Sequence, residues 1–163
     1  MKFTIPFAPV SAGRPKWNSQ GRLSSRAHMP EKYREFRLVA GDWFEDWLEE
    51  HSYELVKYLC RMPDGRKIRQ ADGSFQPDFY GYQITIILYV ETDNSDVRPF
   101  PISSHTSDLD NYYKAVVDLL FESDSFKRVA KLNDRLLQSM TTAKVAVKRG
   151  EGHIDVDLDF LKV

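Results

Sequence analysis

The last segment of the chain alternates strictly between apolar and acidic residues. HIDVDLDFL (153–161) sets four apolar residues at one series of alternate positions and three aspartates at the other: Ile154, Val156, Leu158 and Phe160, against Asp155, Asp157 and Asp159. Successive side chains of a strand point to opposite faces. The segment therefore predicts a strand with one apolar and one acidic face, which requires a sheet to pair with.

Three further segments are typical of strands. FTIPF (3–7) is a short apolar-polar run, YQITIILYVET (about 82–92) is rich in β-branched and aromatic residues, and LLQSMTTAKVAV (136–147) precedes the turn KRGEG (148–152). Runs of this composition between turn residues indicate strands. The chain thus offers four strands to one sheet.

Two segments have helical periodicity. One opens at Pro30 and Glu31, which suit a first helical turn, and runs to about Glu50. Its apolar residues recur at three- and four-residue spacing: Phe36, Val39, Ala40, Trp43, Phe44 and Trp47. The other runs from Asp110 to Phe121.

The order of these elements predicts an α+β fold. We expect a mixed, mainly antiparallel sheet with two main helices, in a single domain over residues 1–163. Residues 51–80 begin in a helix-compatible run and continue with two Asp-Gly turn signals. We interpret about 51–80 as an insert into that domain.

Composition excludes several classes of protein. No apolar run approaches the roughly 18 residues that a membrane span needs, and the first residues lack the apolar core of a secretory signal. Cys60 is the only cysteine, so an intrachain disulfide and a cysteine-rich zinc site are excluded. We expect a cytoplasmic protein that makes no contact with a membrane.

The formal net charge of −1 conceals a segregation of charge. Residues 1–37 carry eight Lys and Arg against two acids, and residues 127–149 carry seven against one. Segregated basic segments can build a positive surface on an otherwise neutral protein. The alternative is that these charges scatter over several faces after folding.

The stretch from Ser107 to Lys114 (SDLDNYYK) carries the strongest chemical signal. If 108–110 is extended, Asp108 and Asp110 point the same way, and a divalent cation relieves the repulsion of their carboxylates. Hard oxygen donors suit Mg²⁺ or Mn²⁺ better than Zn²⁺. The alternative is that these acids are helix caps and partners in helical ion pairs.

Within the second helix, Asp110, Lys114 and Asp118 follow one another at four-residue spacing and form one stripe. Asp134 lies just before the strand 136–147, and Lys144 lies within it. Taken alone, Asp134 could be a turn residue and Lys144 an exposed strand lysine.

Taken together, these residues resemble the core of the RusA-type Holliday junction resolvases, many of which are carried by phages and prophages. That core reads roughly Asp-Leu-Asp-Asn-x-x-Lys-Ala-x-x-Asp-Ala-Leu, then Asp-Asp-x-x-Ile/Val and a lysine ten residues after the second Asp. The matching residues are Asp108, Leu109, Asp110, Asn111, Lys114, Ala115, Asp118, Leu120, Asp134 and Lys144. Pro9-Val10 and Arg14-Pro15-Lys16 after the first strand are similar too.

The resemblance implies a Mg²⁺-dependent endodeoxyribonuclease, with Mn²⁺ as a possible substitute, that resolves four-way junctions in recombination and repair. By that resemblance the metal ligands are Asp108, Asp110 and Asp134. Lys114 would then stabilise charge on the phosphate, and Asn111 would cap the helix or orient a carboxylate. The residues chosen for phosphate contacts are Arg14, Lys16 and Lys144.

The chain departs from the family pattern at two informative positions. Asn133 replaces the first Asp of the Asp-Asp pair, and Val117 stands where some members carry an aromatic residue thought to wedge into the junction. A catalytically inactive accessory protein of phage recombination or packaging, with the same fold and DNA binding, is the alternative function. A module unrelated to nucleic acids, with its acids as caps, is a further one.

We expect branched DNA and a second copy of the chain as partners, in a bacterial cell or a phage-infected host. One chain carries one set of the three acids, whereas resolving a junction takes two cuts, which favours a two-fold homodimer. The aromatic residues of 36–60 could form the subunit contact or be buried under the insert.

Overall fold

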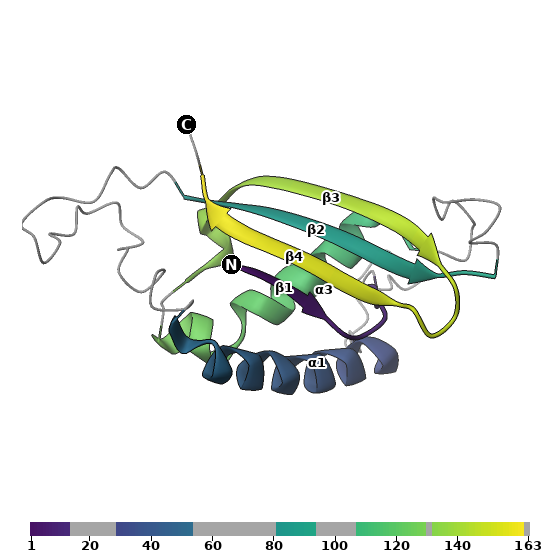
Figure 1. Cartoon of the computed structure of the whole chain (residues 1–163), viewed down its shortest axis with the longest axis horizontal. Helices are drawn as coiled ribbons and strands as arrows, with labels where there is room; N and C mark the ends of the chain where they lie inside the picture. Colours follow the sequence, from purple (N-terminus) through teal and green to yellow (C-terminus); the bar gives the residue numbers. More distant parts are fainter. Residues whose placement is uncertain (14–28, 54–80, 94–106, 130–131, 162–163) are drawn as a thin grey trace, which may run out of the picture.

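The computed structural model describes residues 1–13, 29–53, 81–93, 107–129 and 132–161 (Figure 1). Its helices and strands are β1 (Lys2–Ile5), α1 (Glu31–Glu50), β2 (Tyr82–Glu91), α3 (Leu109–Phe121), β3 (Leu137–Val147) and β4 (His153–Phe160). Two single turns, η1 (Ser125–Val129) and η2 (Asp134–Leu136), connect α3 to β3. The predicted α+β class with two main helices is confirmed; the insert lies outside the described residues from position 54 onward.

The four strands form one mixed sheet in the order β1-β4-β2-β3. β4 is antiparallel to both of its neighbours, whereas β2 and β3 are parallel. Parallel strands need a crossover connection, and the segment containing α3 supplies it. The start of α3 therefore follows the end of β2, and its far end leads back to the start of β3 (Figure 1).

One face of the sheet is apolar and the other polar. Ile154, Val156 and Leu158 of β4 are buried, as are alternate residues of β2, and both helices cover this face (Figure 1). On the opposite face, Thr4 Oγ1 donates to Asp155 Oδ1 at 2.6 Å and Lys2 Nζ lies 3.1 Å from Asp157. The alternation in 153–161 predicts this arrangement correctly.

Helix α1 turns a stripe of apolar residues toward the core. The fully or nearly buried members are Tyr33, Phe36, Ala40, Phe44 and Leu48. Val39 lies beside this stripe and is 48% exposed, because its short side chain does not reach the core.

The larger tryptophans on the edge of that stripe do reach inward. The Trp47 ring lies 4.9 Å from that of Phe3, and the Trp43 ring lies 6.3 Å from that of Phe7, measured between centroids. Phe44 is fully buried, whereas Trp43 and Trp47 are partly buried and pack against the core. The subunit contact considered above stays a prediction, because Tyr53 is 74% exposed and residues 54–60 lie outside the described residues.

The turn between β3 and β4 has to pass the end of β2, because β2 lies between those two strands. Glu91, the last residue of β2, accepts hydrogen bonds from the backbone N–H groups of Gly150 and Gly152 at 3.0 and 3.2 Å. A Cβ at Gly152 would meet the Ala8 Cβ at 2.8 Å. Glycine thus permits a close approach that the strand order imposes.

No helix within the described ranges has the length and apolar character needed to span a bilayer.

Candidate active site

The first turn of α3 is held in place from two sides. The Ala12 N–H donates to the Asn111 carbonyl at 3.0 Å, and the Ser107 and Ser11 hydroxyls are hydrogen-bonded at 2.8 Å. From β3, Lys144 Nζ donates to the Ser107 carbonyl at 3.0 Å. The segment that follows β1 and the third strand of the chain therefore fix the start of this helix together.

Asp108 and Asp110 are both exposed on this first turn. Asp108 occupies the N-cap position with extended backbone, but its side chain makes no capping hydrogen bond. The helix begins at Leu109, so the premise of an extended 108–110 segment is wrong. The partial positive charge of a helix N-terminus nevertheless favours carboxylates at both positions.

Asn111 is the third residue of the helix and does not cap it. Its backbone carbonyl accepts from Ala12, as described above. The orienting role expected for its side chain stays a prediction.

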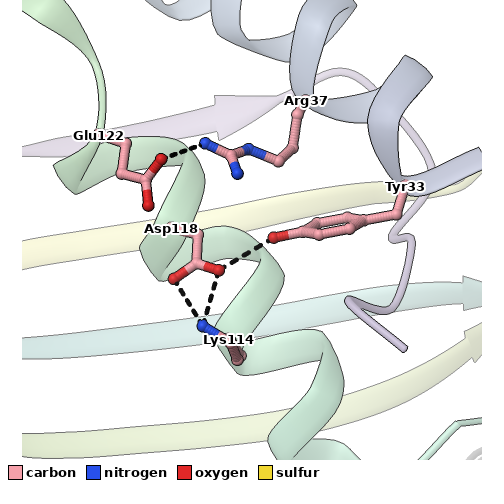
Figure 2. A network of polar contacts seen from close by, with 5 residues as sticks. All are labelled: Tyr33, Arg37, Lys114, Asp118 and Glu122. Carbon is pink, nitrogen blue, oxygen red and sulfur yellow. Dashed lines mark hydrogen bonds and ion pairs between the residues drawn. The ribbon is translucent and has the colours of Figure 1, made fainter. Parts of the chain in front are cut away.

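Lys114 lies one turn beyond Asp110 and is paired with Asp118, as their spacing predicts (Figure 2). The lysine Nζ lies 3.0 Å from Asp118 Oδ1 and 2.8 Å from Oδ2. Asp118 Oδ2 also accepts a hydrogen bond from the hydroxyl of Tyr33, at 3.0 Å, from α1. A second link between these helices joins Arg37 to Glu122.

Burial raises the pKa of Tyr33 to about 12, and the charge of Asp118 adds to that rise. The phenol is protonated in the physiological range, as any tyrosine is, and the raised pKa keeps it a hydrogen-bond donor to Asp118 at a more alkaline pH as well. Sequence reasoning missed this tyrosine as part of the site. The spacing of Tyr33 from the other apolar residues of α1 indicates that it is buried, but it does not indicate contact with α3.

The raised pKa of Tyr33 predicts a loss of stability at alkaline pH. Between about pH 10 and 12 an unfolded chain releases the phenolic proton while the folded chain retains it, so the free energy of unfolding falls as pH rises. We expect the free energy of unfolding, measured with urea at each pH, to fall less steeply over this window for Tyr33→Phe than for wild type. Tyr53→Phe, at an exposed position, is the control, and equal declines in all three proteins would contradict this assignment.

Asp134 begins η2, just before β3, and is exposed. Asn133 caps that turn: its Oδ1 accepts the Arg135 N–H at 3.0 Å. Asn133 thus has a structural task, which an aspartate at the same position could also perform. The pKa of Tyr113 is raised by burial and, next, by the negative charge of Asp134, which therefore lies near the side of α3.

The three aspartates are not gathered at one point in a single chain. Lys144 contacts Ser107, the residue before Asp108, whereas Asp134 lies before the start of β3. At about 3.3 Å per residue, about 23 Å of strand separates Leu137, the first residue of β3, from Lys144. Among the described residues, no three His, Cys, Asp or Glu side chains are placed to hold a metal ion together. The carboxylates have the ligand chemistry that Mg²⁺ needs, but one subunit does not assemble them.

The other positions singled out in the sequence fall in different places. Lys144 is half-buried against Ser107, and Val117 is only 7% exposed, so nothing at position 117 projects toward a ligand. Arg14 and Lys16 lie outside the described residues.

Comparison with protein-family models matches residues 6–158 to the family described as Endodeoxyribonuclease RusA. A comparison with curated proteins gave no match. The matched range includes α1, the start of α3 and Asp134, and therefore every part of the site described above.

Proposed function

The chain belongs to the family of RusA endodeoxyribonucleases. From this we propose that it is a Mg²⁺-dependent enzyme that resolves four-way DNA junctions by two paired cuts, one in each of two opposed strands. The observation that carries the proposal is the family match over residues 6–158, combined with Asp108, Asp110 and Lys114 on consecutive turns of one anchored helix. Metal-dependent phosphodiester hydrolysis uses carboxylates to hold the metal, and a cation near the phosphate can stabilise the developing charge.

We propose that Asp108, Asp110 and Asp134 hold the metal ion. When bound, Mg²⁺ would lower the pKa of a water molecule and polarise the phosphate. Around it, the chain's own residues have separate tasks. Lys114 places a positive charge one turn from Asp110, where it can stabilise charge developing on the phosphate oxygens.

We propose further that the working unit is a homodimer in which Asp134 of one copy joins Asp108 and Asp110 of the other. The finding that no three carboxylates of the described residues come together within one chain supports this. Two exposed apolar side chains flank the two halves of the site: Leu109, beside the first pair of acids, and Met140 on the edge strand β3 after Asp134. A two-fold pair would place two complete sites on one junction.

DNA is expected to approach the helix start and not the open face of the sheet. Asp155, Asp157 and Asp159 line that face and repel phosphates. Ala12 is hydrogen-bonded to Asn111 at the start of α3 and lies two residues before Arg14 in the sequence. We propose that Arg14 and Lys16 contact DNA phosphates. Lys144 donates one hydrogen bond to Ser107, and an ammonium carries three donors, so it could also serve a phosphate.

Substrate choice tests this proposal. The protein is incubated with Mg²⁺ and either a four-way junction or a linear duplex that contains the sequence of two of its arms. We expect nicked duplex products from the junction and none from the linear DNA. Equal cleavage of both would indicate a nuclease without structure selectivity, and binding without cleavage would favour the inactive accessory protein.

A further inference from the structure

The carboxylate of Asp118 is shared between two donors from different helices (Figure 2). Lys114, on the same helix, approaches both of its oxygens, and Tyr33 reaches one of them from α1. In Figure 2 the tyrosine hydroxyl and the lysine nitrogen both point toward this carboxylate, from α1 and from α3 respectively. The Asp118 carboxylate thereby connects the Lys114 ammonium to Tyr33 in the core.

The exposure of the three side chains falls stepwise from the ammonium inward. The Lys114 side chain is 63% exposed and that of Asp118 18% exposed, while Tyr33 as a residue is 4% exposed. A lysine side chain is flexible and usually samples many rotamers on a surface. Here its acceptor is fixed by a buried, rigid aromatic ring, so the ammonium has a defined resting position.

We propose that Asp118 and Tyr33 are positioning residues for Lys114: Tyr33 holds the Asp118 carboxylate, and the carboxylate holds the ammonium one turn beyond Asp110. The inference rests on the proposed function, in which Lys114 acts on the phosphate. Displacements of about 1 Å in such a group can cost up to about 100-fold in rate. The placement of α1 thus affects catalysis, because Tyr33 and Asp118 transmit it to the Lys114 ammonium through hydrogen bonds.

The same contacts could merely join two helices, and the molecule contains a control for that alternative. Arg37 and Glu122 also link α1 to α3, one helical turn further from Lys114, and neither touches the lysine (Figure 2). Glu122→Gln weakens the link between the helices without altering the acceptor of Lys114. Asp118→Asn keeps the size of the side chain but weakens the hold on the ammonium.

The experiment measures single-turnover cleavage of a four-way junction with Mg²⁺ at saturating enzyme, junction affinity without cleavage, and thermal stability. We expect Asp118→Asn to slow cleavage by roughly 10- to 100-fold and to leave the dissociation constant within about two-fold. Tyr33→Phe, which keeps its ring in the core, should slow cleavage less but measurably. Glu122→Gln should cleave at the wild-type rate.

The decisive comparison uses Lys114→Gln as a background. If Asp118 acts through Lys114, adding Asp118→Asn to Lys114→Gln should cause no further loss of rate, since residues that act as a unit are not additive. A full additional loss, or wild-type cleavage by Asp118→Asn, would overturn the proposal. Should Asp118→Asn fold poorly, the pair Tyr33→Phe and Lys114→Gln gives the same comparison.

Failure of the proposed function has a different signature. If wild-type protein does not cleave junctions at all, the function and the positioning role both fall. If wild-type protein cleaves and Lys114→Gln slows it, but Tyr33→Phe and Asp118→Asn do not, only the positioning role is wrong. If Lys114→Gln itself is harmless, nothing is being positioned for the chemistry, and the proposal is again overturned.

Discussion

Asp110→Asn is expected to slow single-turnover junction cleavage by roughly 100- to 1,000-fold or more, the usual range for removing one electrostatic group from an active site. Junction binding should stay the same or become tighter, because the change removes a negative charge that repels phosphates. The substitution preserves side-chain size on an exposed first turn, so the helix should remain intact. Cleavage and binding are measured on the same protein preparation.

The matched control for this prediction is Asp124→Asn. Asp124 is also exposed and loses the same charge, but it is paired with Arg128 after the far end of α3. It should cleave at about the wild-type rate. If Asp110→Asn cleaved at the wild-type rate, Asp110 would not be a metal ligand, and its role would be limited to stabilising the first turn of the helix.

Mixing two inactive variants should restore activity if the acids of one site come from two subunits. Asp110→Asn and Asp134→Asn are each expected to be inactive alone. In a mixed dimer, one site then contains both substitutions and the other contains neither. Random exchange leaves about one quarter of the sites intact, so nicking should recover to about that level. Single nicks rather than paired cuts are expected, because a mixed dimer holds one working site.

The control for the mixing experiment combines Asp108→Asn with Asp110→Asn. Both residues lie on the same turn of α3, so each site of any mixed dimer contains one substitution. No recovery is expected. If Asp110→Asn and Asp134→Asn also fail to complement, the three acids do not assemble across subunits, and the proposed arrangement is wrong.

Local patterns predicted the elements of the fold accurately. The alternation in 153–161 and the apolar spacing of 31–50 reflect the periodicity of single strands and helices, and both elements lie where expected. Such patterns do not tell which strand pairs with which. The parallel pairing of β2 with β3, and the place of β2 between β3 and β4, depend on contacts between residues far apart in the sequence.

In the candidate site, too, contacts within one helix could be predicted from the sequence, whereas contacts between distant segments could not. The Lys114–Asp118 pair is a neighbour relation on one helix and follows from spacing alone. The contact of Tyr33 with Asp118 joins positions 85 apart, and no local pattern reports it. The supposed extension of 108–110 failed because Leu109 and Asp110 already take part in the helix.

The most direct test of this account is the metal dependence of junction cleavage. Wild-type protein is incubated with a four-way junction in Mg²⁺, in EDTA, and in EDTA followed by excess Mg²⁺, while binding is followed in parallel. We expect paired cuts in Mg²⁺, none in EDTA with the junction still bound, and recovery of cleavage when Mg²⁺ is restored. Equal cleavage in EDTA, or a bound junction that stays uncut in Mg²⁺, would contradict it.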